Sequence, residues 1–147
     1  MRKIIGILLA ILLIGLVVGG GVKRLKKEDG QKIMIGERVV LVEIKDTEEE
    51  RRQGLSNREN LDKDTGVLFI FEELGKYDFW MKEMKFDLDF VWIKGEEVVE
   101  ITEGVKAPKE GEKPVRLRPK VLVDRVLEVN SGWVKDNEIK VGDGVRF

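Results

Sequence analysis

An uncharged, strongly apolar stretch at residues 4–22 constrains this chain more than any other feature of its sequence. As a helix, these 19 residues extend roughly 28 Å, close to the thickness of about 30 Å of the hydrocarbon core of a membrane. A helix buried in a soluble domain would show a polar face, and this stretch has none. We therefore predict one membrane segment within residues 1–27, followed by a single small soluble domain.

The residues around this stretch do not decide whether it is cleaved or stays in the membrane as an anchor. Basic residues come before it and three glycines at 19–21 follow its apolar part, which is the order of a signal peptide. No Ala-x-Ala cleavage site is present, so an uncleaved signal-anchor is favoured over a cleaved peptide. Positive charges are slightly more numerous after the stretch than before it, which favours a cytoplasmic domain, but a short basic tail before a first apolar helix is a common export signal. We expect a single-pass protein with its domain outside the cytoplasm, or a secreted protein if the segment is cleaved.

The composition of the chain excludes several chemistries. It has no Cys and no His, so it can form neither a disulfide nor a Ser-His-Asp triad, and it lacks the usual ligands of zinc. We expect no cofactor, and whether an oxygen-binding metal is held stays open. Abundant Lys and Glu, with few Asn, Gln, Ser and Thr, are typical of proteins from very hot environments.

The distribution of charge argues against a nucleic-acid partner. Since residues 1–27 hold six of the 27 basic residues and none of the 28 acidic ones, residues 28–147 carry a net charge of −7. Binding to phosphates depends on a basic surface that releases counterions. We therefore predict no nucleic-acid binding by the domain.

Short apolar runs separated by turn residues predict a domain built mainly of strands. Residues 28–38 form a linker and a first short strand, and the main domain covers residues 39–147. A mainly β fold follows, either a compact β-sandwich or a partly closed barrel. The further strands are predicted at 39–44, 67–71, 77–81, 86–93, 97–105, 121–129 and 145–147, with a long exposed loop at 106–118.

One or two short helices interrupt the strands. Thr47 and Glu50 form a capping box at the start of a helix that stops at Gly54. Ser131 is expected to cap a second helical turn near Trp133.

Several short motifs follow one another in the order of a known family. The motifs are Val42-Glu43, Thr47, Glu50-Arg51-x-x-Gly54-Leu55, Arg58, Asp64-x-Gly66-x-Leu68-Phe69-x-Phe71, Phe79-Trp80-Met81-Lys82, Leu88-Asp89, Val126-Leu127-Glu128 and Gly142-Asp143-x-Val145. Together they resemble the domain of unknown function 192 family, small proteins of bacteria and archaea often found behind export signals. The resemblance covers residues 39–147 and implies a compact, mainly β fold with no established activity. Ser56, Glu83 and Asp87 replace the Met, Asn and Pro usual in that family, so no site that depends on the Met or Asn is expected here.

Two aspartates are candidate site residues. Asp87 and Asp89 are two positions apart on a predicted strand and so share one face. With Glu83 nearby they could bind Ca²⁺ or Mg²⁺, or act as acid and base. The alternative is an exposed, solvated strand face opposite the apolar positions.

Three further candidates lie earlier in the chain. If Phe79 and Met81 face the core, Trp80 is partly exposed and could stack on a sugar ring or bind a protein; the alternative is a Trp packed under the long loop. Arg51 and Arg58 could hold an anionic ligand. Alternatively, they pin the loop by pairing with acidic side chains, for which the candidates are Glu50, Asp62 and Asp64.

Two function classes remain. The first is a membrane-tethered binding or structural module with an envelope protein or polysaccharide as partner, and the missing Cys and His favour it. The alternative is a carboxylate- or metal-dependent hydrolase acting on envelope material through Asp87, Asp89, Glu83 and a Lys or Arg. A concave pocket that contains at least two of these carboxylates would favour the hydrolase.

Overall fold

The computed structural model describes residues 30–147, so the predicted membrane segment and the first two residues of the linker, 28 and 29, lie outside the described residues. Within 30–147, no helix is long and apolar enough to cross a membrane. The strands are β1 (Gln31–Ile35), β2 (Arg38–Lys45), β3 (Thr65–Gly75), β4 (Phe79–Trp80), β5 (Leu88–Lys94), β6 (Glu97–Val105), β7 (Arg116–Leu117), β8 (Val123–Asn130) and β9 (Val145–Arg146), and the helices are α1 (Glu48–Gln53) and α2 (Trp133–Asp136).

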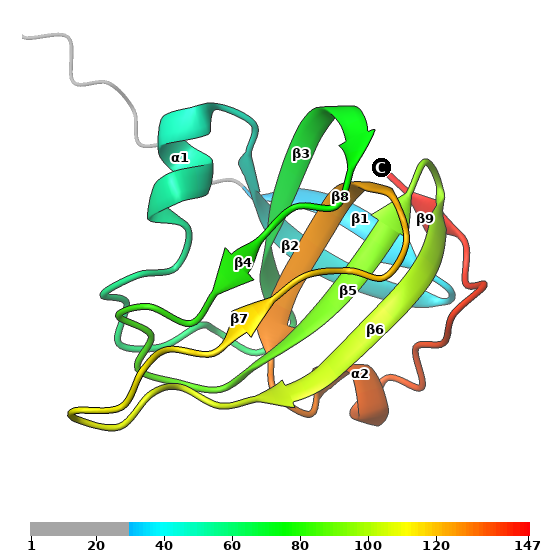
Figure 1. The fold of residues 1–147 in the computed structure, drawn as a ribbon. Coiled ribbons are helices and arrows are strands. Elements are labelled where there is room, and N and C mark those ends of the chain that lie inside the picture. The colour runs from blue at the N-terminus through cyan, green and yellow to red at the C-terminus, as the bar shows by residue number, and fades with distance from the viewer. Residues whose placement is uncertain (1–29) are drawn as a thin grey trace, which may run out of the picture.

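One curled sheet dominates the fold (Figure 1). Its seven strands run in the order β6-β5-β8-β3-β2-β1-β9, and β4 and β7 form a separate two-stranded ribbon in front of it. The sheet's two edges meet at one end, where Glu97 and Gly144 form a bridge and the Val145 amide donates to the Glu96 carbonyl at 2.7 Å. The predicted mainly β fold is confirmed, and the curled sheet corresponds to the partly closed barrel and not to the sandwich.

Apolar side chains cover both faces of the sheet, because successive residues of a strand point to opposite sides. On β8, Leu127 and Val129 belong to one core and Val126 to the other. The inner core, which contains Leu127 and Val129, draws on β1, β2 and β9 as well as the central strands, and α2 packs against it. The outer core, which contains Val126, lies over β3, β5, β6 and β8, and residues of the 77–86 segment and of β7 cover it. The β4–β7 ribbon therefore acts as a lid on the outer core.

Helix α1 belongs to the connection between β2 and β3, which pair in parallel. Parallel neighbours need a crossover, and α1 with residues 54–64 makes it. The predicted capping box is confirmed: the Glu50 amide donates to Thr47 Oγ1 at 3.2 Å, and the Thr47 amide donates to Glu50 Oε2 at 3.3 Å. The helix ends at Gly54, whose φ of 50° is one that glycine adopts without strain.

Three local predictions are corrected. Ser131 does not cap α2, because Gly132 is the residue that precedes it and Asp89 accepts from the first amides instead. The exposed loop at 106–118 contains β7, since Arg116 pairs with Trp80 across the ribbon. Strand β3 continues to Gly75, where the chain pairs again with β8 after a register shift.

Candidate functional site

Asp89 has a structural role, and it does not lie on an exposed face of the sheet. Its side chain is 0 % exposed, and three backbone amides donate to it: Gly104 to Oδ1 at 2.8 Å, and Gly132 and Val134 to Oδ2 at 2.9 and 3.1 Å. It therefore joins the end of β6 to the start of α2. The predicted solvated strand face is wrong at this position, because both faces of the sheet are buried.

Asp87 is placed apart from Asp89. It precedes β5 and accepts from Lys106 Nζ at 2.7 Å and from the Ala107 amide at 2.9 Å, and these two hydrogen bonds hold the pKa of its carboxyl below the usual value. Glu83 accepts instead from Asn57 Nδ2 at 3.1 Å. In the part of the chain that the structure describes, no three Asp or Glu side chains are grouped as a metal would require.

The two arginines bind to the protein itself. Arg51 donates to the carbonyls of Asp46 and Ile70, the second at 2.9 Å, and its guanidinium lies 5.0 Å from the centre of the Phe71 ring. Arg58 pairs with Glu43. Both arginines therefore pin α1 and its loop to the sheet. The partners predicted for them (Glu50, Asp62 and Asp64) are wrong.

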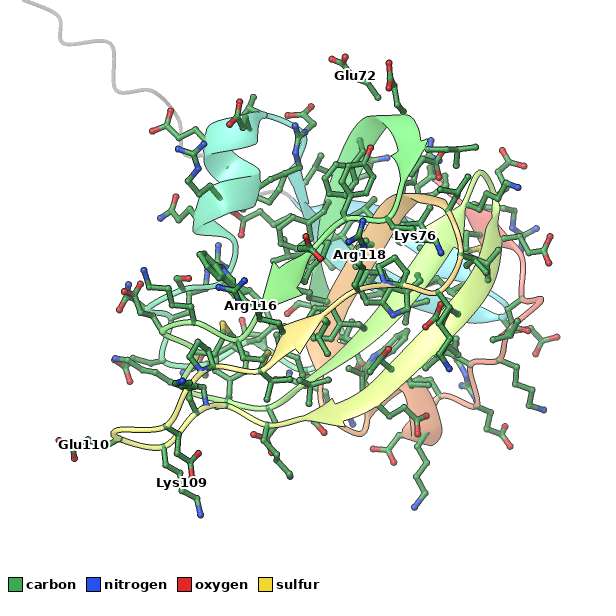
Figure 2. The ribbon with its side chains drawn as sticks, viewed as in Figure 1. Glu72, Lys76, Lys109, Glu110, Arg116 and Arg118 are labelled. Carbon is green, nitrogen blue, oxygen red and sulfur yellow. The ribbon has the colours of Figure 1, made fainter. Side chains whose placement is uncertain are left out.

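Trp80 is 45 % exposed, and its neighbours Phe79 and Met81 face the outer core, as the alternation predicted. The Phe79 ring meets the rings of Phe69 and Trp92 edge-on, with centroids 5.1 and 5.6 Å apart. On the outside, Lys82 Nζ and Arg116 Cζ each lie 5.6 Å from the centre of the Trp80 ring. Figure 2 shows Arg116 on β7, next to β4.

A cavity of about 300 Å³ opens between α1, β3, β4 and β8. Its wall is largely aromatic, and α1 and the turn after it form the opposite side. Of the predicted site residues, it brings together Arg51 and Trp80, while Arg58, Asp87 and Asp89 do not line it. The lining residues are Glu48, Arg51, Arg52, Gln53, Gly54, Leu55, Ser56, Phe69, Phe71, Tyr77, Asp78, Phe79, Trp80, Met84 and Glu128.

Glu128 is the most unusual residue of this cavity. It projects from β8 on the side of the outer core, between Val67 of β3 and Phe90 of β5, and is 5 % exposed. Among residues 30–147, burial alone acts on its carboxyl, and no hydrogen-bonding or charged partner contributes. No fully enclosed side-chain oxygen or nitrogen of these residues lacks a partner, so the carboxyl oxygens of Glu128 open into the cavity. Burial raises the pKa of this carboxyl to about 8. At neutral pH the Glu128 carboxyl in this cavity is therefore largely protonated.

Glu128 was not among the site residues predicted from the sequence, although it belongs to the motif Val126-Leu127-Glu128. The available signal was a charged residue within the apolar run Val126-Leu127-Glu128-Val129. A strand that is buried on both faces has no solvated side for a carboxylate.

The fold and the cavity define a small, mainly β domain with a buried acid under an aromatic wall. Residues 31–147 match the model of a protein family described as DUF192, uncharacterized ACR. The chain belongs to this family, and the resemblance seen in its motifs is confirmed.

Two solved structures are similar to this chain. A candidate transcription regulator from Sinorhizobium meliloti 1021 is 28% identical, with a TM-score of 0.67, and the match covers 78% of this chain and 89% of that one. A protein of unknown function from Novosphingobium aromaticivorans DSM 12444 is 25% identical, with a TM-score of 0.71 and coverage of 80% and 85%. No curated protein matches the chain.

Proposed function

We propose that the domain is a binding module and that the aromatic cavity is its ligand site. The observation that carries the proposal is Glu128, which is 5 % exposed, opens into the cavity and is offered no partner by the described residues. Buried polar groups are ordinarily hydrogen-bonded, and leaving one unpaired costs free energy. A concave, mostly apolar site with one convergent polar group is the usual form of a small-ligand pocket. A ligand group that reached Glu128 would supply the missing partner.

The arrangement of acids favours binding over hydrolysis. Hydrolysis by carboxylates uses two acids at one centre, as an acid and a base or nucleophile. Here Glu128 is alone at the bottom of the cavity. The other two acids of the lining, Glu48 and Asp78, have side chains 81% and 76% exposed and lie at the rim. The pair chosen from the sequence, Asp87 and Asp89, lies outside the cavity.

The proposal includes a membrane tether formed by residues 1–27, with the module outside the cytoplasm and an envelope protein or polysaccharide as the source of the ligand. The uncharged stretch at residues 4–22 supports this part. We expect the full chain to stay with the membrane pellet after alkaline carbonate extraction of cells that express it. Uncleaved chain in the soluble fraction would contradict the tether and leave the binding site unaffected.

A substitution at the mouth of the cavity tests the ligand site. Gln53 lines the cavity from the end of α1, so Gln53→Trp should fill its mouth. We expect small aromatic fragments that bind the full chain in lipid nanodiscs, detected by ligand-observed NMR, to lose affinity about tenfold or more, or over about 1.4 kcal/mol.

Glu49→Trp is the matched control, because it adds the same side chain to the same helix at an exposed position that does not line the cavity. It should leave fragment affinity unchanged. If no fragment binds, or if Gln53→Trp and Glu49→Trp behave alike, the cavity is not the ligand site.

A further inference from the structure

We propose that the cavity selects an organic cation, an ammonium or guanidinium group carried on an apolar or aromatic body. This inference rests on the proposed function, since it names the chemical class of ligand for the same site. The argument comes from the charges around Glu128, from the walls that face it, and from the proton that a cation would replace.

The two arginines that line the cavity are already engaged. On α1, Arg51 is bonded to two backbone carbonyls, and Arg52 Nη2 pairs with Glu48 Oε1 at 2.6 Å. No charged side chain faces Glu128 from the neighbouring strands, which place Val67 and Phe90 beside it.

The segment before β4 brings two further titratable groups to the cavity. The Tyr77 hydroxyl donates to the Glu73 carbonyl at 2.6 Å, and Asp78 lies 3.8 Å from Arg118 Nε at the exposed rim. Neither group offers Glu128 a cation. The two acids at the rim are paired with Arg52 and Arg118, and Arg51 is bonded to backbone carbonyls, so no cation contacts the Glu128 carboxyl.

The walls are also suited to a cation. Aromatic faces attract ammonium and guanidinium groups, most strongly where water is excluded. The Phe71 ring of this wall already carries the Arg51 guanidinium 5.0 Å from its centre. The remaining rings around the cavity give an apolar ligand body its contact area. They are Phe69, Tyr77, Phe79 and Trp80.

The protonation state of Glu128 gives the binding of a cation a different pH dependence from the binding of other ligands. At pH 7 the empty site holds a proton, because burial sets the pKa of its carboxyl at about 8. A cation favours the ionised carboxylate, so its binding releases that proton and strengthens as the pH rises toward 8. A carboxylate or a neutral acceptor would take a hydrogen bond from the protonated acid instead, so its binding would weaken above pH 8.

Three probes of similar size test the inference: phenethylammonium, phenethyl alcohol and 3-phenylpropionate. We propose calorimetric titration of the full chain in phosphatidylcholine nanodiscs at pH 6, 7 and 8, in buffers with different ionisation enthalpies. The amine stays charged at these pH values, because alkylamines titrate near about 10. We expect it to bind tightest of the three, with affinity about tenfold higher at pH 7 than at pH 6 and with release of nearly one proton at pH 7.

The matched variants are Glu128→Gln and Glu49→Gln. The first replaces the acid at the bottom of the cavity by an amide of the same shape, and we expect it to lower phenethylammonium affinity at pH 8 about tenfold or more and to abolish proton release. The second removes one exposed charge from α1 and should change neither.

The remaining outcomes distinguish the two proposals. If the alcohol or the phenylpropionate binds as tightly as the amine and Gln53→Trp blocks it, the cavity is a ligand site but the cation inference is wrong. The inference also fails if phenethylammonium binds without releasing a proton, or binds Glu128→Gln as well as the native chain. If no probe binds, the inference fails, and the proposed function falls with it when the fragment screen is also empty.

Discussion

Replacing Asp89 with Ala is expected to lower the free energy of unfolding by at least about 4 kcal/mol, because three backbone amides, one buried and two partly buried, would lose a charged acceptor. This is a large part of the 5–15 kcal/mol that is typical of a domain. Urea denaturation followed by circular dichroism measures the loss. Asp89→Asn should lose less, since one oxygen remains to accept from the amides of Gly132 and Val134.

Asp87→Ala is the control for this expectation. Asp87 also accepts from a backbone amide and from a lysine, but its side chain is one-third exposed and water replaces the lost contacts. We expect a change of about 1 kcal/mol, typical of a surface interaction. Equal losses for Asp87→Ala and Asp89→Ala would contradict the structural role given to Asp89.

Glu128→Gln is expected to act in the opposite direction and to stabilise the protein by about 3 kcal/mol at pH 7. An unfolded chain releases the Glu128 proton near 4.5, while the folded chain keeps it up to about 8. Between these values unfolding releases a proton, so the native chain loses about 1.4 kcal/mol of stability per pH unit as the pH rises. The amide of Gln does not titrate and removes this loss.

Denaturation of the native chain and of Glu128→Gln at pH 5, 7 and 8.5 gives the test. The two proteins should be similar at pH 5 and diverge as the pH rises, with no further divergence well above pH 8. Glu49→Gln, at an exposed position, should follow the native chain throughout. Parallel profiles for the native chain and Glu128→Gln would show that Glu128 ionises freely in the folded state.

A residue that lowers stability at ordinary pH needs a reason to be there. Stabilising substitutions are readily available to proteins, and sites that forgo them are commonly functional. Glu128 fits that description, because Gln would fill the same space without the charge. The binding role proposed for the cavity explains why an acid stands at this position.

The sequence predicted what depends on neighbours along the chain. The capping box of Thr47 and Glu50 involves residues three apart, and its geometry leaves little choice. The placement of Phe79 and Met81 inward and Trp80 outward followed from strand alternation alone. Most strands were found for the same reason, since apolar runs between turn residues are local signals.

Features set by distant pairing could not be predicted. The closure of the sheet joins Glu97 to Gly144, and the partners of Arg51 and Arg58 come from β3 and β2. Asp89 shows the limit most clearly. Alternation placed it on a face that is solvated in many sheets, but here the second face is also buried and its three donors come from residues 104, 132 and 134.

The cavity was missed for a related reason. It forms where α1, β4 and β8 meet, and these segments are far apart in the sequence. Arg51 and Trp80 were both chosen from the sequence, yet nothing local indicated that Glu128 lies at the bottom of the same cavity. A charged residue within an otherwise apolar strand is the one signal that could have been used.

Titration of the Glu128 carboxyl is the most direct test of the central claim that this acid is buried without a partner. The full chain carrying ¹³C at glutamate side-chain carboxyls, in lipid nanodiscs, gives the titration by NMR, and Glu128→Gln identifies the resonance. The account predicts a midpoint at about pH 8 in the free protein. A midpoint near 4.5, the ordinary value for glutamate, would contradict it.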